Sequence, residues 1–472
     1  MVGIRDRLLS TLPKKSFARS ASLLVGGTLG SQALLILVSP LLTRLYSPSD
    51  FGLLAVYTSI LTITLLISSL RYDVAIPLPE DDVEAVNVFA LSLVLVGMFA
   101  LTTSIIVLFW RDGISELLEI PSLANFLWLL PVGILIAGTF NVLVQWNVRK
   151  KKFGLIASTK LRQALVAVSI QLLAFKLNGL ALILAQISSN GTGVTRLSKP
   201  NFNDVSWEGL KQAAIRYQRF PLFSAPAGLA RVTGVELPAL ILTSAFNPAA
   251  AGLYALTNRV LGVPANVLGG AVSQVFASGA AEAYRAGKLG ILVRDLYAKM
   301  AQIGLPFMLL LMMLGPSLFS LVFGKEWAQA GEFARWMAPW LYLVFVSSPI
   351  TTVTAVMERQ KQGLLFHLSL LAARMVALYL GVLSEDLMIT VMLLASVNAV
   401  WRLGFLFWIY IISGNTVRSF VIDSSMALFK ALICVSPVAI ALLFFNVFLV
   451  HLFVVSMLLI LFMYWNLLKQ AY

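Results

Sequence analysis

Charged side chains lie inside the apolar segments of this chain, where they could bind an ion or a charged ligand. Away from the segment ends most of them are basic: Lys160, Arg162, Arg231, Arg259, Arg374 and Arg402, with Glu236 as the acid. Charges buried for structural reasons usually come in pairs of opposite sign, so an excess of bases indicates a further partner. Arginine suits phosphate because its planar guanidinium group forms two parallel hydrogen bonds. The pattern predicts a site or pathway for an anionic ligand.

Two of these charges are predicted to form an ion pair. Glu236 and Arg259 lie at equal distances in sequence from a turn at residues 247–248, so we expect them at one depth. A lone carboxylate there would be costly, and Arg259 is level with it. Arg231 lies about 140° around the helix from Glu236 and cannot easily share that acid. Arg231 is therefore the first candidate to bind the anionic ligand, and Arg374 is the second.

Each of these bases also has a structural interpretation. A base between helices can join them through hydrogen bonds. Lys160 and Arg162 lie near the inner end of their segment, from which their side chains can reach the membrane surface. The sequence is consistent with both interpretations.

A charged pair, Arg71 and Asp73, follows the apolar segment 51–70. Residue 71 lies twenty residues beyond Phe51, and at 1.5 Å per residue this is about 30 Å, the thickness of a bilayer core. We therefore expect Arg71 at the inner membrane face, either as a first contact for the ligand or as a base reaching for the surface. Residues two apart point to nearly opposite sides of a helix, so Arg71 and Asp73 are not expected to pair.

The residues that carry metal or redox chemistry are sparse. Cys434 is the one cysteine, so it can form neither an internal disulfide nor a thiolate cluster, and His367 and His451 lie far apart. No acidic pair has metal-ligand spacing, and no Walker-type loop is present. We expect no enzyme activity and no cofactor, and coupling to a proton or sodium gradient stays open.

The composition is that of a membrane protein. The 472 residues are 59% hydrophobic and 12% charged, and the mean hydropathy is +0.89. A membrane helix needs about 20 apolar residues, and this window predicts an all-α polytopic protein with about fourteen spans. They lie near 20–43, 51–70, 85–110, 124–146, 155–175, 178–195, 217–246, 249–275, 295–323, 333–357, 362–383, 387–413, 429–445 and 452–467. The segment "SSNGTG" is expected to interrupt the span 178–195.

Basic residues predict the orientation, because Lys and Arg accumulate in cytoplasmic loops. They are frequent in the N-terminal segment 1–19 and in "RKKK" at 149–152. The predicted outer loops carry few: Arg44, Arg111, Lys176 and Lys325. Both termini are therefore expected in the cytoplasm, and the first apolar run is expected to be a retained span because it is too long for a signal-peptide core.

An internal repeat predicts the domain organisation. Residues 41–56 ("LLTRLYSPSDFGLLAV") resemble residues 241–256 ("ILTSAFNPAAAGLYAL"), and each copy covers an outer turn. Identical pairs include Thr43/Thr243, Pro48/Pro248, Gly52/Gly252 and Ala55/Ala255. Six helices separate the copies, so the halves are parallel repeats related by a pseudo-twofold axis along the membrane normal. We expect six-helix lobes at 20–195 and 217–413, a cytoplasmic linker at 196–216 and two further helices at 429–467, with the ligand pathway between the lobes.

Four segments resemble the polysaccharide (Wzx-type) flippases of the multidrug/oligosaccharidyl-lipid/polysaccharide (MOP) exporter superfamily. They are "LTRLYSPSDFGLLAVYTSI" (42–60), "RYDVAIPLPEDDVEA" (71–85), "GLYALTNRVLGVPANVLGGAVSQVF" (252–276) and "FGKEWAQAGEFARWMAPWLYLVFVSSPI" (323–350). The resemblance implies a bacterial inner-membrane protein that flips a polyprenyl-diphosphate-linked oligosaccharide of an O-antigen, capsule or exopolysaccharide to the periplasmic leaflet. It also implies that other polysaccharide-assembly membrane proteins could be partners, and it gives no role to nucleic acid.

Two other functions are compatible with a polytopic membrane protein. A cation-coupled multidrug exporter of the same superfamily would be expected to carry acids in its first lobe, but residues 20–43 contain neither Asp nor Glu. A membrane-embedded sugar transferase or polymerase usually needs a catalytic carboxylate or base in a sizeable loop. The longest predicted outer loop, 111–123, is too short for such a domain.

Overall fold

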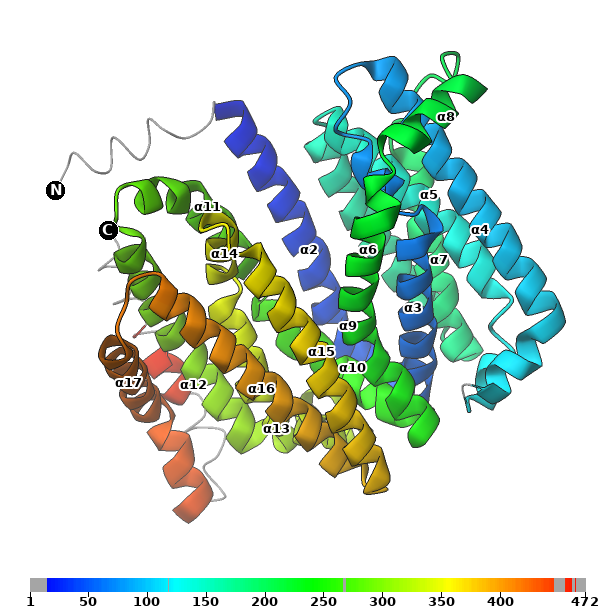
Figure 1. The fold of residues 1–472 in the computed structure, drawn as a ribbon. Helices are drawn as coiled ribbons and strands as arrows, with labels where there is room; N and C mark the ends of the chain where they lie inside the picture. Colours follow the sequence, from blue (N-terminus) through cyan, green and yellow to red (C-terminus); the bar gives the residue numbers. More distant parts are fainter. Residues whose placement is uncertain (1–14, 118, 266–268, 445–454, 461–462, 464–472) are drawn as a thin grey trace. The chain divides into compact units, whose positions relative to one another are not determined.

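The computed structural model describes residues 15–117, 119–265, 269–444, 455–460 and 463. Every regular element in these ranges is a helix, which confirms the all-α prediction (Figure 1). Contacts divide the chain into two compact units, Met1–Gly252 and Leu253–Tyr472. The predicted lobes and linker stay a prediction, because this division does not test them.

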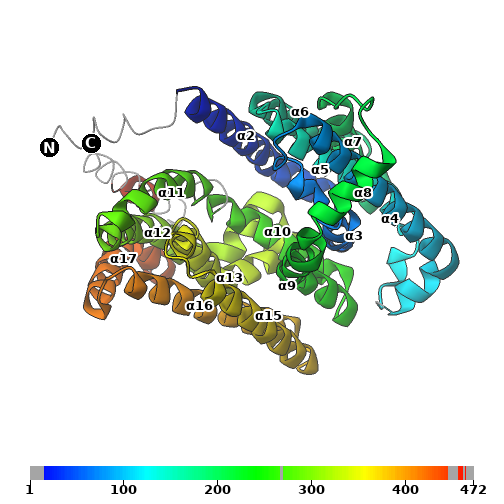
Figure 2. The same cartoon turned by 45° about the horizontal axis from the view of Figure 1, so that its top comes forward.

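The first unit contains the helices α2 to α9 and the start of α10. Their bounds are α2 (Lys15–Leu45), α3 (Pro48–Ser68), α4 (Asp82–Leu117), α5 (Leu129–Arg149), α6 (Phe153–Leu173), α7 (Gly179–Arg196), α8 (Trp207–Arg216), α9 (Ala225–Ala245) and α10 (Pro248–Pro264). Helix α2 packs along α6, α6 on α7, α4 on α5 and α3 on α9 (Figures 1 and 2). A short 3-10 turn, η1 (Tyr72–Ala75), joins α3 to α4.

The start of α3 is determined by local sequence. Ser47 caps the helix, and the Asp50 carboxylate accepts a hydrogen bond from the Ser47 backbone N–H in return. Pro48 stands in the first turn, where a missing N–H costs nothing. The Tyr46 hydroxyl donates to the carbonyl of Gln171 at 2.6 Å. Burial, with a contribution from Asp50, raises the pKa of Tyr46 to about 12, so this donor stays protonated.

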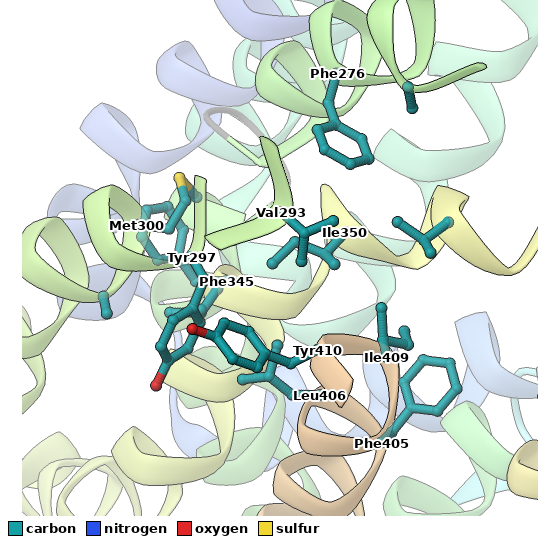
Figure 3. Close-up of a cluster of buried hydrophobic side chains, with 14 of the residues drawn as sticks. Phe276, Val293, Tyr297, Met300, Phe345, Ile350, Phe405, Leu406, Ile409 and Tyr410 are labelled. Atoms are coloured by element: carbon teal, nitrogen blue, oxygen red, sulfur yellow. The ribbon is translucent and has the colours of Figure 1, made fainter. Parts of the chain in front are cut away.

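The second unit is built around α12 and α13. Its helices beyond α10 are α11 (Gly270–Arg285), α12 (Leu289–Phe323), α13 (Ala328–Ser347), α14 (Val353–Val356), α15 (Gln360–Leu383), α16 (Leu387–Ile412) and α17 (Val417–Phe444). Figure 3 shows the buried cluster that joins α11, α12, α13 and α16, with Tyr297 and Tyr410 at its centre. Their rings meet edge to face, 5.4 Å between centroids. Helices α15 and α16 lie side by side in both ribbon views (Figures 1 and 2).

The described helices confirm a multi-pass membrane protein. Ten are long and apolar enough to cross a membrane, or up to eleven if Lys325–Ser347 and Ile350–Val356, bent by 54°, count as one broken span. Pro349 lies at that break, where it cannot donate a helix hydrogen bond. The number of fourteen spans stays a prediction. Most of the predicted span 452–467 lies outside the described residues.

One span prediction differs from the structure. The segment "SSNGTG" does not interrupt its helix, because α7 is continuous from Gly179 to Arg196. Gly193 lies so close to α5 and α6 that an added Cβ would meet Phe140 at 2.3 Å and Gln163 at 2.8 Å. Glycine serves here for close helix packing and not as a helix breaker. The predicted span 249–275 covers α10 and the first part of α11, and residues 266–268 between them lie outside the described residues.

Candidate functional site

The structure holds Arg374 between α13, α15 and α16 in the second unit. Its Nε atom donates to the Asn398 side-chain oxygen at 2.6 Å, and its guanidinium group lies over the Trp340 ring, 5.9 Å from the centroid. The buried Asn398 amide donates to the carbonyl of Leu394 at 2.7 Å, which turns its oxygen toward Arg374. Asn398 is neutral, so this hydrogen bond orients the guanidinium group without cancelling its charge.

Arg402 is brought to the same place by helix periodicity. It follows Asn398 by four residues on α16, so the two side chains share a face. Because Arg374 donates to Asn398, Arg402 faces the same part of α15 from one turn further along α16. The Arg402 Nε atom is buried and has no hydrogen-bond partner within the described residues. Trp401 donates from its indole N–H to Ser369 at 3.0 Å and ties α16 to α15. The structure thus brings together two of the predicted bases.

Glu236 has a partner that sequence reasoning missed. It lies on α9, and its carboxylate accepts a hydrogen bond of 2.8 Å from the hydroxyl of Ser59, a buried residue of α3. A serine inside an apolar run gives no signal of a contact with a residue 177 positions away. The predicted Glu236–Arg259 pair involves residues of different units and stays a prediction.

Arg231 lies on α9 with an exposed side chain. Within the part of the chain that the structure describes, it has neither a hydrogen bond nor an ion pair, so it does not share the Glu236 carboxylate. This agrees with the separation of the two around the helix. Its proposed contact with a ligand stays a prediction.

Lys160 and Arg162 lie in the first half of α6 and point to different sides of that helix. The Lys160 ammonium donates to the Thr28 hydroxyl of α2 at 3.3 Å, and Arg162 is exposed. A further base, Arg196 at the end of α7, donates to Ser158 at 3.4 Å, and its Nε atom is buried with no hydrogen-bond partner among the described residues. Arg196 was not among the predicted candidates because a base at the end of an apolar run is typical of a membrane-surface position.

Arg71 lies in an unusual backbone turn. Leu70 and Arg71 both have left-handed conformations, with φ of 47° and 66°. Such conformations cost side-chain-bearing residues about 1–2 kcal/mol each, and they persist where the surroundings determine them. The Arg71 Nε atom is buried and has no hydrogen-bond partner within the described ranges. The buried Asp73 carboxylate instead accepts a hydrogen bond from Ser69 at 2.8 Å.

The two copies of the repeat touch each other at their turns. A Cβ added to Gly52 would lie 1.7 Å from the carbonyl oxygen of Pro248, and one added to Gly252 would lie 1.9 Å from that of Pro48. The contact is reciprocal, which is the property of a surface that lies on a twofold axis. All four residues belong to the first unit. The close approach requires a residue without a side chain in both copies, and the pseudo-twofold relation of the predicted lobes stays a prediction.

No group of three or more His, Cys, Asp and Glu side chains that could hold a metal ion occurs among the residues searched, those that the structure describes. The bases described above occupy several places in both units, and among the predicted ones Arg374 and Arg402 lie on facing parts of α15 and α16. Arginine side chains in such places are suited to binding anions.

Solved structures define the class of the fold. The lipid II flippase MurJ in an inward closed conformation matches with a TM-score of 0.65 at 11% identity, covering 96% of this chain and 98% of that one. An inward-facing multidrug-resistance MATE transporter of the MOP superfamily matches with a TM-score of 0.64 at 15% identity, covering 82% and 94%. A MOP-superfamily transporter from Pyrococcus furiosus matches with a TM-score of 0.51 at 14% identity, covering 84% and 95%. The chain therefore has the fold of the MOP-superfamily transporters.

A family model is more specific than the fold. The model described as polysaccharide biosynthesis protein matches residues 41–332, more than half of the chain. The chain belongs to this family, which confirms the resemblance found in the sequence. Its fold is thus one found in membrane transporters, and its family is described by polysaccharide biosynthesis. Curated proteins gave no match.

Proposed function

We propose that this protein moves a polyprenyl-diphosphate-linked oligosaccharide from the cytoplasmic to the periplasmic leaflet of the bacterial inner membrane. The observation that carries the proposal is that Arg374 donates a hydrogen bond to the neutral Asn398, which lies one turn before Arg402 on the adjacent helix α16. A diphosphate that meets two neighbouring guanidinium groups gains charge-assisted hydrogen bonds from both. Membership of a polysaccharide biosynthesis family supports a glycan on the same lipid.

The predicted bases would then act in sequence along the path. Arg71 would meet the head group at the inner mouth, and Lys160 and Arg162 would attract it near the membrane surface. Arg231 and Arg259 would lower the electrostatic cost of moving a diphosphate through the membrane. The lipid tail could stay in the bilayer while the head group crosses.

Movement would occur by alternating access between the proposed lobes, 20–195 and 217–413. The reciprocal contact at Gly52 and Gly252 supports two related halves. In this proposal no cofactor takes part, and coupling to a proton or sodium gradient stays open. Both termini would lie in the cytoplasm.

A deletion strain tests this function. Loss of the protein should cause a lipid-linked oligosaccharide to accumulate on the cytoplasmic side and should deplete the corresponding surface polysaccharide. Wild-type protein should reverse both effects, and Arg374→Ala together with Arg402→Ala should not, at equal membrane abundance. Unchanged surface polysaccharide with no accumulated intermediate, together with new sensitivity to cationic drugs, would support the multidrug exporter instead.

A further inference from the structure

Helix α8 is a short surface helix whose orientation is fixed by α4. Arg216 forms an ion pair with Glu84 at 2.8 Å, and the Tyr217 hydroxyl donates to the same carboxylate at 3.0 Å. Burial and this hydrogen bond raise the pKa of Tyr217, so the phenol stays a donor. The Asn87 side chain donates to the Asp204 carbonyl and accepts from the Ser206 N–H, which holds the segment before α8.

A second attachment comes from η1, where the Tyr72 hydroxyl donates to the carbonyl of Ala214 at 3.0 Å. Gly209 lies so close to Asn87 that an added Cβ would meet its side chain at 2.4 Å. Figure 1 shows α8 beside the N-terminal end of α4. These contacts hold one side of α8 against the protein. They therefore determine which side chains of α8 face outward.

The outward side of α8 carries an aromatic, a basic and an aliphatic residue in one stripe. Trp207 is 81% exposed and Ile215 is 57% exposed, and the exposed Lys211 lies midway between them. The spacing of i, i+4 and i+8 places the three side chains on one face. The opposite face is buried through Ala213 and Tyr217. An exposed tryptophan and isoleucine on a firmly held helix indicate a partner.

The stripe continues toward the membrane-spanning part of the chain. The next span begins at Phe220, and its first turn presents Leu222 at 62% exposure and Phe223 at 70%. These side chains belong to a segment that fits a lipid environment, and the exposed Arg219 lies between them and α8. Apolar residues on both sides of a base form the pattern expected where a chain passes from the head-group layer into the hydrocarbon core.

We propose that the stripe Trp207–Lys211–Ile215 binds the head-group layer of the lipid bilayer, with anionic lipids as the partners of Lys211 and Arg219. Tryptophan suits this layer because its ring is apolar and its N–H can remain hydrated. A basic side chain reaches toward anionic head groups while its stem stays in apolar surroundings. The connection between α7 and α9 is thereby fixed at the depth of the membrane surface. The charge distribution assigns this surface to the cytoplasmic leaflet, and the proposal does not depend on what the protein transports.

Site-directed spin labelling of the full chain tests the proposal. In a Cys434→Ser background, single cysteines would replace Trp207, Ile215, Leu222 or Asn203, and the proteins would be placed in nanodiscs of phosphatidylcholine with phosphatidylglycerol. Labels at 207 and 215 should be several-fold more accessible to oxygen than to a water-soluble nickel chelate, as at 222, the lipid control. The label at the exposed Asn203 should show the opposite order. Equal nickel accessibility at 203, 207 and 215 would overturn the proposal.

Two comparisons identify the partner. Lys211→Glu should make the label at 207 more accessible to the nickel chelate, that is, less protected by lipid. Nanodiscs of phosphatidylcholine alone should have the same effect. Protection in native membranes but not in either nanodisc would show that a protein covers the stripe, which would also overturn the proposal. Each variant must match the unlabelled protein in thermal unfolding, and Glu208→Cys, on the same helix, controls for general loosening of α8.

Discussion

At the scale of single residues, Asn398 is the most informative position in the proposed diphosphate site. Its oxygen accepts from Arg374 at 2.6 Å, and Arg402 lies one turn further along α16. Sequence reasoning found both arginines because charges in apolar segments are conspicuous. It could not find their association, because which face of α15 meets α16 depends on packing across the whole second unit. It could not find Asn398 at all, because a neutral amide in a helix resembles any other polar position.

Asn398→Asp separates a charge role from a structural one. The substitution keeps the shape and the hydrogen bond to Arg374 but adds a negative charge beside both arginines. If the pair binds a diphosphate, transport should fall about tenfold or more, as for Arg374→Ala, because charged hydrogen bonds contribute about 1.5–3 kcal/mol. The new ion pair with Arg374 offsets the lost hydrogen bond from the Asn398 amide to the Leu394 carbonyl, so the temperature of thermal unfolding should change little. Wild-type transport by Asn398→Asp would show that the positive charge is not used.

Arg71 can be tested with two substitutions that remove the same side chain. Glycine adopts left-handed backbone conformations readily and alanine does not, so Arg71→Gly should be more stable than Arg71→Ala by about 1 kcal/mol. Both should lower transport, whereas Arg71→Lys should retain part of it if charge and fork geometry both matter. Equal transport by the wild type, lysine and alanine forms would mean that Arg71 only reaches for the membrane surface.

At the scale of helices, the reciprocal glycine contact between the two repeat copies gives a sharp prediction. Gly52→Ala places a methyl group within 2 Å of the Pro248 carbonyl, and Gly252→Ala does the same at Pro48. Each should destabilise the protein by about 1–3 kcal/mol or more, because backbone must move to make room. Gly97→Ala in α4, where an added Cβ would meet no neighbouring group within 4 Å beyond its own helix backbone, is the control and should not destabilise. Unchanged thermal unfolding of Gly52→Ala would contradict the contact.

The same glycines show how far sequence reasoning reaches at this scale. Hydropathy predicts most spans, because length and apolar composition are local properties. The repeat was visible because Pro48, Gly52 and their counterparts are identical in type. The continuity of α7 through Gly193 was not visible, since a glycine that breaks a helix and one that allows close packing look alike in sequence. Only the neighbouring Phe140 and Gln163 distinguish the two.

At the scale of the whole molecule, the proposed transport path depends on both units. The predicted Glu236–Arg259 pair would connect them, while Ser59 already donates to Glu236 within the first unit. Exchanging the charges, Glu236→Arg with Arg259→Glu, should retain part of the transport that each single substitution loses, because the attraction between opposite charges is preserved. Additive losses in the double variant would exclude the pair. Arg231→Ala should abolish transport without loss of folded protein if that base meets the substrate.

The central claim, that a lipid diphosphate is carried through a cationic path, is tested most directly by flipping in proteoliposomes. A fluorescent polyprenyl-diphosphate oligosaccharide would be placed in both leaflets. The loss of fluorescence after a membrane-impermeant reducing agent is added would then be measured. With wild-type protein nearly all of the fluorescence should be lost, because molecules of the inner leaflet reach the outer one. With Arg374→Ala and Arg402→Ala combined, at equal incorporation, about half should remain protected, as expected for a leaflet that is not exchanged. The claim would be contradicted if both proteins gave equal loss of fluorescence, or if about half of the fluorescence stayed protected with the wild type.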